Sequence, residues 1–401
     1  MGDWLPAPSE SRLRIIMLGY IVRGPIGGMT WANLHYLRGL AGLGHEVYFF
    51  EDSDDYVSCY DPDKGCMGTD PSYGLRYGRA VLERVGFGQH WVYYDAHRDE
   101  WHGPCASRVN QICGSADLLI NRAGVNPLRP WLLSVPRRVL IDVDPVFTQI
   151  RHLSDTDAMG LAQQHNVFFS LAENIGTTVS RIPDDGLPWQ PTRHPIYLPD
   201  WPVRPPVTDA RWSTLMQWES YPAKAWDGIT YGVKSDSFKN FLDLPRRVGQ
   251  SVELVISGAS APRDLLSQYG WLCRDPRELS GDPWVYRSFI QSSKAELGIA
   301  KEGYCLAASG WFSERSAAYL ASGRPVVTQD AAFSPRFPTD AGLLSFTDVE
   351  EAAEAVADVN ARYAYHCEAA REIAEAYFDS GPLLENLVDR AMSSSLGPRP
   401  R

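Results

Sequence analysis

The N-terminal part of the chain alternates short apolar runs with one longer helical pattern. Residues 13–18 (LRIIML) and 45–51 (HEVYFFE) are the apolar runs, and each is typical of a buried strand. Between them, a loop with several glycines leads into apolar positions at helical spacing, which predict a helix from about Thr30 that ends before Gly44. Strand, glycine loop, helix, glycine and strand in this order are typical of the βαβ unit of a doubly wound sheet.

Apolar runs of strand length recur along the rest of the chain. We expect further strands at 117–120, 138–143 and 167–171, and a second series at 213–218, 252–257, 296–300, 325–328 and 343–346. Helices are expected at 74–85, 349–357 and 382–392, and a long polar surface loop at 53–73. Residues 182–209 are too rich in proline for a helix or a central strand, so they predict an extended linker.

We therefore predict an α/β protein of two Rossmann-like, doubly wound domains that face each other across a cleft. The N-terminal domain would span 12–181, the linker 182–209 and the C-terminal domain 210–392, followed by a disordered tail at 393–401. A chain of 401 residues is too long for one ordinary core, which favours two domains. Ligands of doubly wound sheets bind beyond the carboxyl ends of the strands, so we expect the substrate between the domains.

Composition and charge narrow the possible partners. The net charge is −11 and no basic stripe stands out, so we expect no nucleic-acid partner. No run of about eighteen apolar residues occurs, so we expect no membrane span. The seven cysteines form no CxxC pair, which predicts reduced thiols in a cytoplasmic enzyme without a cysteine-based metal site.

The segment 310–330 (GWFSERSAAYLASGRPVVTQD) is the most informative part of the chain. It predicts a helix that starts at Ser313 with Glu314 in its first turn, ends at Gly323 and leads into a short buried strand. A helix N-terminus presents unpaired N–H groups and a partial positive charge, which suit a diphosphate. An ordinary αβ unit of a parallel sheet, with no ligand, explains the same pattern.

Two segments carry a resemblance to a known superfamily. Residues 24–52 (GPIGGMTWANLHYLRGLAGLGHEVYFFED) and 301–333 (KEGYCLAASGWFSERSAAYLASGRPVVTQDAAF) resemble the GT-B superfamily of nucleotide-sugar-dependent glycosyltransferases. The second segment is similar to the donor-binding unit of bacterial group 1 glycosyltransferases. The resemblance implies transfer of a sugar from a nucleoside diphosphate, such as UDP, to a hydroxyl or amine of a small-molecule or glycan acceptor. It implies no cofactor and no obligatory metal, and it suggests a bacterial polymer-surface or natural-product pathway.

One departure from that superfamily concerns catalysis. Retaining members often carry two glutamates eight positions apart in the donor-binding unit, and the matching positions here are Gly310 and Ala318. Neither is acidic, so the glutamate pair does not transfer to this chain and the anomeric stereochemistry stays open.

Donor-binding candidates come from both ends of the chain. In the resemblance, the loop with Gly27 and Gly28, and Thr30 after it, face the donor phosphates. At the helix start near position 313, hydroxyls, N–H groups and charged side chains would bind the diphosphate and sugar: Ser313, Glu314, Arg315 and Ser316. A cation is also needed to neutralise the departing diphosphate, and our order of candidates is Lys301, Lys234 and Arg263.

An inverting enzyme would also need a general base, for which a carboxylate or a histidine is suitable. The strand at 138–143 delivers Asp142 and Asp144 to the cleft, and Asp144 is the first candidate. His165 and Glu173 flank the next strand and are the other two. The Asp-x-Asp spacing also resembles the metal site of a different glycosyltransferase class, but the order of the domains is wrong for it, so we predict no metal.

Three other functions fit parts of the pattern. A sugar-nucleotide epimerase or a phosphorylase would use the same two-domain frame, and a non-catalytic nucleotide-sugar-binding protein would fit the missing glutamate pair. A dehydrogenase is disfavoured because the first βα turn lacks GxGxxG, although Glu51 and Asp52 end the second strand.

Overall fold

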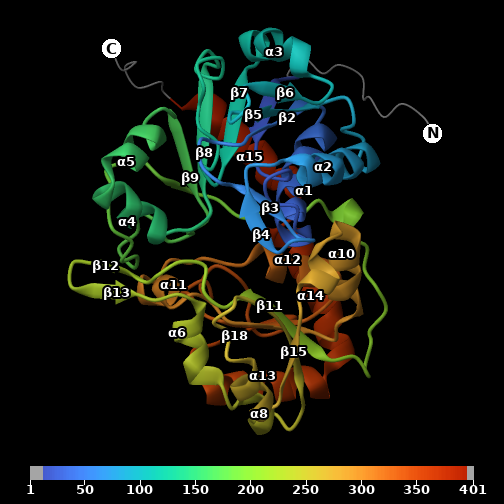
Figure 1. Cartoon of the computed structure of the whole chain (residues 1–401). Coiled ribbons are helices and arrows are strands. Elements are labelled where there is room, and N and C mark those ends of the chain that lie inside the picture. Colours follow the sequence, from blue (N-terminus) through green and yellow to red (C-terminus); the bar gives the residue numbers. More distant parts are fainter. Residues whose placement is uncertain (1–11, 395–401) are drawn as a thin grey trace.

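The computed structural model describes residues 12–394 and contains two large, mostly parallel sheets, each covered by helices. Figure 1 shows the N-terminal half above the C-terminal half, and we call these the first and the second half. Two doubly wound α/β units that face each other confirm the predicted fold class.

The first half is built on an eight-stranded sheet with the order β10-β9-β8-β7-β1-β2-β5-β6, in which β6 alone runs antiparallel to its neighbour. Its strands are β1 (Arg14–Leu18), β2 (Glu46–Asp52), β5 (Trp91–Asp95), β6 (Glu100–His102), β7 (Leu118–Arg122), β8 (Arg137–Asp142), β9 (Val167–Ser170) and β10 (Gln190–Pro191). Its helices are α1 (Gly27–Gly42), α2 (Ser72–Arg84), α3 (Val109–Ser115), α4 (Phe147–Ser154) and α5 (Thr156–Ala162).

The second half is built on a six-stranded parallel sheet with the order β15-β14-β11-β16-β17-β18. Its strands are β11 (Trp212–Gln217), β14 (Val252–Ser257), β15 (Trp271–Arg274), β16 (Glu296–Gly298), β17 (Val326–Gln329) and β18 (Leu343–Phe346). Its helices are α6 (Lys234–Phe238), α7 (Leu244–Arg247), α8 (Arg263–Gln268), α9 (Arg277–Ser280), α10 (Pro283–Ser292), α11 (Glu302–Leu306), α12 (Glu314–Ala321), α13 (Val349–Ala361) and α14 (Tyr363–Tyr377).

Three segments for which the sequence pattern predicts no regular structure contain some. The expected surface loop 53–73 contains a hairpin of β3 (Cys59–Asp61) and β4 (Cys66–Gly68), which is tied to the core by the Tyr60 N–H bonded to the Arg23 carbonyl at 2.9 Å. A second hairpin, β12 (Lys224–Trp226) and β13 (Ile229–Tyr231), projects toward α4 (Figure 1). The proline-rich segment contains β10 and one turn of 3-10 helix, so it packs on the core instead of hanging free.

The last helix, α15 (Ser380–Ser393), returns to the first half and packs along α1 (Figure 1). A Cβ on Gly39 of α1 would lie 2.5 Å from the side chain of Leu384, and the Arg137 guanidinium donates to the Met392 carbonyl at 2.8 Å. The predicted range 210–392 therefore joins this helix to the wrong half, because the close contacts of its apolar face are with α1. The predicted tail at 393–401 lies outside the described residues from position 395 onward.

Candidate functional site

A cavity of about 360 Å³ lies between the two halves. The first half lines it with the start of α1 and the ends of β7 and β8, and the second half with the ends of β11 and β14, with α10 and with the start of α12. Its polar and charged lining residues include Arg122, His194, Gln217, Ser313, Glu314 and Arg315. The cavity is therefore at the carboxyl edges of both sheets, where doubly wound folds bind ligands.

Several buried polar atoms at this cavity have no hydrogen-bond partner within the described residues. They are Nε and Nη1 of Arg122, Oε1 of Glu314 and Nε1 of Trp311. A buried polar atom without a partner destabilises the fold by about 1–3 kcal/mol, so such atoms are uncommon and rarely gather in one place. Their clustering around one cavity indicates a place for a polar ligand.

Glu314 is the carboxylate that faces this cavity. Burial raises its pKa to about 7, against the opposing effect of the Arg122 and Arg315 charges. Nε2 of His35 lies 3.7 Å from its Oε1, beyond hydrogen-bonding distance. Because Nδ1 of His35 accepts the Tyr197 N–H at 3.0 Å, the proton of the neutral ring is on Nε2 and points to Glu314. Burial lowers the pKa of His35 to about 3, so the ring stays neutral.

Two basic side chains, Arg315 and Lys234, lie near the start of α12. Nε of Arg315 donates to Oε1 of Glu296 at 2.6 Å, and burial followed by the nearby Arg315 charge holds the pKa of Lys234 well below its usual value. Among the described residues, the Lys234 ammonium has no hydrogen bond or ion pair. Ser313 occupies the N-cap position, but its hydroxyl makes no capping bond, so the first N–H groups of α12 are open to a ligand.

Lys301 and Asp144, predicted as the diphosphate cation and the base, contact each other. The Lys301 ammonium lies 2.8 Å from Oδ1 of Asp144 and 2.6 Å from the Tyr221 hydroxyl, and the hydroxyls of Tyr221 and Tyr304 both donate to Asp144. The rings of Phe147, Tyr221 and Tyr304 surround the ammonium at 4.5–5.2 Å. Neither charged residue lines the cavity, so this cluster joins the two halves beside it.

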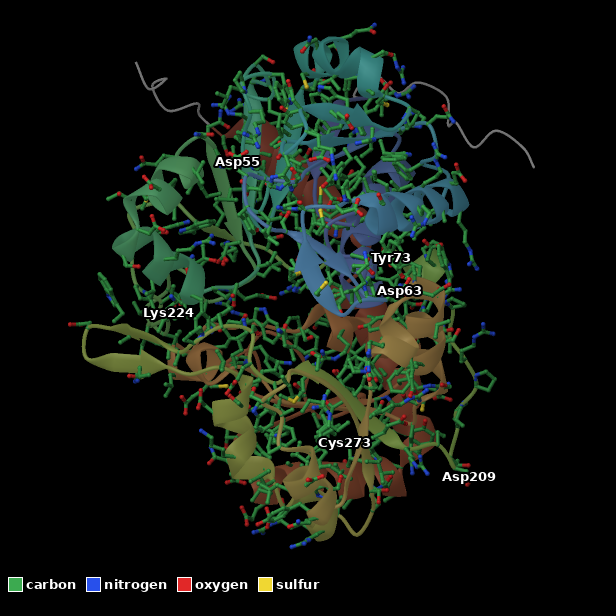
Figure 2. All side chains as sticks on the ribbon, in the orientation of Figure 1. Asp55, Asp63, Tyr73, Asp209, Lys224 and Cys273 are labelled. Atoms are coloured by element: carbon green, nitrogen blue, oxygen red, sulfur yellow. The ribbon has the colours of Figure 1, made fainter. Side chains whose placement is uncertain are left out.

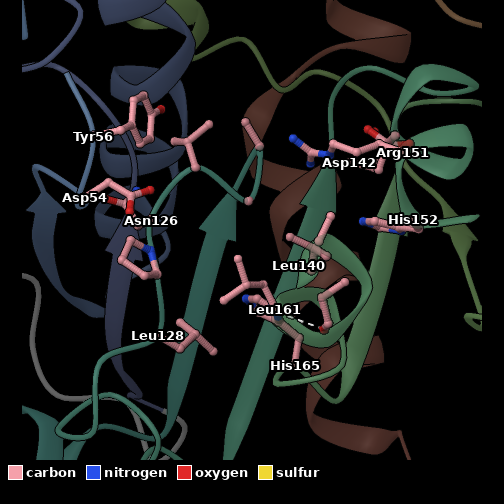
Figure 3. A pocket seen from close by; sticks show the side chains of 17 residues that line it. Asp54, Tyr56, Asn126, Leu128, Leu140, Asp142, Arg151, His152, Leu161 and His165 are labelled. Atoms are coloured by element: carbon pink, nitrogen blue, oxygen red, sulfur yellow. Dashed lines mark hydrogen bonds between the residues drawn. The ribbon is translucent and has the colours of Figure 1, made fainter. Parts of the chain in front are cut away.

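The other candidate bases also lie away from the cavity. Glu173 forms a bidentate ion pair with Arg193. His165 lines a separate cavity of about 190 Å³ within the first half, among Leu128, Leu140 and Leu161 (Figure 3). Its ring nitrogens are bonded to the Ala162 carbonyl and to the Asn121 amide, and burial lowers its pKa to about 4. The structure thus corrects the expected cleft position of both residues.

The loop between β1 and α1 (residues 19–26), which we call the glycine loop, holds its shape through a buried carboxylate. The N–H groups of residues 21–23 donate to Glu51 at 2.6–2.8 Å. In a dinucleotide-binding enzyme, the acidic residue at the end of this strand binds the ribose of the cofactor. Here Glu51 already accepts three backbone N–H groups, which argues further against a dehydrogenase. Gly27 and Gly28 lie in the first turn of α1, not in a loop, and pack on Tyr286, although Gly28 also lines the cavity.

Two further donor candidates have internal partners. The Thr30 hydroxyl is bonded to the Tyr77 hydroxyl at 2.7 Å. Arg263 is exposed and donates to the carbonyls of Ile256 and Gly258. Of the predicted donor residues, the structure therefore gathers Gly28, Ser313, Glu314 and Arg315 at the cavity, with Lys234 near Arg315, while Ser316 is buried in α12 and does not line the cavity.

The sequence pattern does not single out Arg122 and His194, which line the cavity, or His35, which lies behind Glu314. Arg122 ends a buried strand, and the rule that selected Asp144 at the end of β8 applies equally to it. His35 belongs to α1 and follows its apolar stripe, so no local signal distinguishes it from a core residue. In the part of the chain that the structure describes, no group of three or more His, Cys, Asp or Glu side chains is placed to hold a metal. No helix among the described residues is long and apolar enough to cross a membrane.

Solved structures share this fold at low sequence identity. An alpha-glucosyltransferase in complex with UDP-glucose and DNA containing an abasic site has a TM-score of 0.62 at 12% identity, over 96% of this chain and 100% of that one. AviGT4, a glycosyltransferase involved in avilamycin A biosynthesis, has 0.52 at 13%, over 96% and 99%. HepE of Anabaena, in complex with UDP and glucose, has 0.52 at 12%, over 96% and 100%. The likeness confirms that this chain has the GT-B fold. No model of a known protein family matches the chain, and no curated protein does.

The exclusion of nucleic acid as a partner is wrong. Similar structures of alpha-glucosyltransferase contain DNA with an abasic site, with an A:G mismatch or with a HMU base. A net charge of −11 does not decide the question, because it sums over the whole surface and not over the face that meets a ligand.

Proposed function

We propose that this chain is a glycosyltransferase that uses a nucleoside-diphosphate sugar. The donor occupies the cavity between the halves, its diphosphate lies at the start of α12 beside Arg315 and Lys234, and its sugar faces Glu314 and Arg122. The observation that carries the proposal is the cluster of partnerless buried polar atoms from both halves around this one cavity.

The proposed reaction joins the acceptor to the sugar. A bond forms between the acceptor oxygen or nitrogen and the anomeric carbon, and the bond from that carbon to the diphosphate oxygen breaks. The diphosphate leaves with the electron pair, and Lys234, Arg315 and the N–H groups of α12 stabilise its charge without an obligatory metal or cofactor. Glu314 takes the acceptor proton, because its pKa of about 7 suits a proton acceptor near neutral pH.

UDP is the first nucleotide to test, because similar structures contain UDP or UDP-glucose. A ligand of the folded state raises the melting temperature, so we expect UDP to stabilise the protein more than NAD does. Lys234→Gln removes the unpaired amine, which a bound diphosphate would hold in its charged form, and weakens UDP binding by roughly tenfold, as for one lost charge-assisted contact. The matched control is Lys239→Gln, since Lys239 is exposed and paired with Asp236 on the same segment. Equal UDP affinity in both variants would remove Lys234 from the donor site.

Turnover separates the remaining functions. UDP release from UDP-glucose that depends on an acceptor supports transfer, whereas turnover with inorganic phosphate indicates a phosphorylase. Binding without any turnover indicates a non-catalytic binding protein. The acceptor panel includes phenols, aromatic amines, oligosaccharides and short DNA, since AviGT4 takes part in avilamycin A biosynthesis and other similar structures contain DNA. A bacterial natural-product pathway in the cytoplasm is the setting that we propose.

A further inference from the structure

A second cavity of about 430 Å³ adjoins the donor cavity on the side of the first half. Residues of the β3–β4 hairpin, of the glycine loop and of α1 line it. The two cavities share Tyr20, Ile26, Met29, Gln217 and Ser257. A molecule in the second cavity can therefore extend a reactive group toward the donor sugar.

Several large apolar and aromatic side chains line this second cavity and remain exposed to solvent. Tyr56 and Met67 stay 57% and 52% exposed, and Met29 and Tyr60 stand beside them. Large apolar side chains that gather at one exposed place indicate a binding surface, and methionine adapts to ligands of varied shape. Flat aromatic molecules stack well on tyrosine rings.

The charge around this cavity is strongly negative. Residues 51–70 carry seven carboxylates and one lysine, in a chain whose whole net charge is −11. Asp52 and Asp55 are neutralised by Arg129, and Asp61 by Lys64, but Asp54 and Asp63 have no ion pair among the described residues. Figure 2 shows Asp63 where the first half faces the second.

The one cation among the described residues of the cavity wall is mostly engaged by the protein. Arg23 is buried, and its two terminal nitrogens donate to the carbonyls of Ser53 and Val125. Its Nε has no hydrogen-bond partner among the described residues, but it lies 4.0 Å from the Glu51 carboxylate, which offsets its charge. Asp54 and Asp63 do not line the cavity themselves, but they lie on the same segment as its lining residues Tyr56 and Met67. Their unpaired charges would therefore attract an ammonium group in the cavity and repel an anionic one.

We propose that the second cavity binds the acceptor and that this acceptor is an aromatic, apolar small molecule that carries an amine or no charge. The proposal rests on the proposed glycosyl transfer and specifies its acceptor class. Stacking on Tyr56 and Tyr60 holds the ring, the carboxylates of residues 51–70 attract the amine, and the shared wall delivers the hydroxyl or amine to the donor.

Two ligands with the same ring and opposite charge test this proposal directly. The neutral apolar dye N-phenyl-1-naphthylamine reports occupancy through its fluorescence, and tryptamine and indole-3-acetate compete for its site. We expect tryptamine to displace the dye at a roughly tenfold lower concentration at low salt, and the difference to shrink as salt screens the carboxylates. Absence of dye binding, equal or better displacement by indole-3-acetate, or stronger displacement by a short DNA duplex would overturn the proposal.

A matched pair of variants locates the dye. Met67→Arg places a cation and a bulkier side chain at the cavity and should weaken tryptamine binding by roughly tenfold. Leu161→Arg is the control, since Leu161 is 50% exposed but lines the separate cavity of Figure 3. Equal tryptamine binding by both variants contradicts the assignment.

The dye assay needs no turnover, so the two proposals fail separately. UDP binding and transfer without a tryptamine preference would overturn the acceptor class alone. A tryptamine preference that Met67→Arg removes, in a protein that binds no nucleotide, would overturn the glycosyltransferase and leave an aromatic-amine site.

Discussion

Lys301 and Asp144 link the two halves of the molecule through a contact of 2.8 Å between the ammonium nitrogen and a carboxylate oxygen. The partners are 157 positions apart in the chain, and aromatic rings from both halves surround the ammonium. Each charge neutralises the other. In this structure the two residues therefore form an ion pair that joins the halves, and Asp144 does not act as a free general base or Lys301 as a free cation for the diphosphate.

Loss of either partner of this ion pair should destabilise the protein. Lys301→Met leaves the part-buried Asp144 carboxylate without its cation and should lower the free energy of unfolding by on the order of 2 kcal/mol. Asp144→Asn should act similarly, and the double variant should lose less than the sum of the two. Urea denaturation measures all three. Lys64→Met, which breaks the exposed pair with Asp61, is the control and should change little. Strict additivity would contradict a direct interaction.

Glu314 should make stability depend on pH. Its folded pKa of about 7 is above the usual 4.5, so the folded chain holds a proton in this interval that the unfolded chain has released. Stability should therefore fall as pH rises from about 4.5 to 7. Glu314→Gln lacks this loss and should exceed the wild type by up to about 3 kcal/mol at about pH 8, with no difference near pH 4.

Denaturation curves across this pH range measure the effect. Glu354→Gln, on the exposed face of α13, is the matched control and should track the wild type. A Glu314→Gln curve parallel to that of the wild type would show that the carboxylate is not buried in solution.

Gly27 should tolerate no larger side chain. A Cβ there would lie 2.7 Å from Cβ of Tyr286 in α10, so Gly27→Ala forces α1 away from α10 and should destabilise the fold by about 1–3 kcal/mol. Gly160 in α5 has no atom within 4 Å of such a Cβ, and Gly160→Ala should leave stability equal or slightly higher. Thermal unfolding distinguishes the two, and equal melting temperatures would contradict the contact.

Cys66 should be the first thiol to react with iodoacetamide. It is the exposed cysteine among the seven, whereas burial raises the pKa of the thiols at Cys59, Cys105 and Cys113 and so removes their reactive thiolates. Mass spectrometry of peptides after brief labelling measures the order. Cys66→Ser should abolish the fast phase, and early labelling elsewhere would contradict it.

The fold was readable in the sequence because its signals are local. Apolar runs at 13–18, 45–51 and 252–257 match β1, β2 and β14 to within one residue at each end, since a strand buried on both faces needs an uninterrupted apolar run. The β3–β4 hairpin has no such local signal, because its side chains are mixed in polarity and its anchor to the core is a bond from the Tyr60 N–H to the distant Arg23 carbonyl.

The site was only partly readable, because its geometry is set by contacts between distant segments. Glu314 and Arg315 were found from a helix start, which is a local feature. Asp144 and Lys301 were each identified as strand-end charges, but their mutual pairing follows from how the two sheets meet. His165 has the right chemistry, yet the Asn121 and Ala162 partners that engage both ring nitrogens leave no trace in the spacing of residues.

The return of α15 to the first half has a mechanical consequence. The described chain passes between the halves twice, near Pro202 and near Asp379. Backbone hydrogen bonds join the two connections next to these points: the Ile196 N–H donates to the Phe378 carbonyl at 2.7 Å, and the Ser380 N–H donates to the Ile196 carbonyl at 3.0 Å. Two connections that lie side by side form a hinge with a single axis. We therefore expect any opening of the halves to turn about that line, so that the gap widens most at the edge farthest from it.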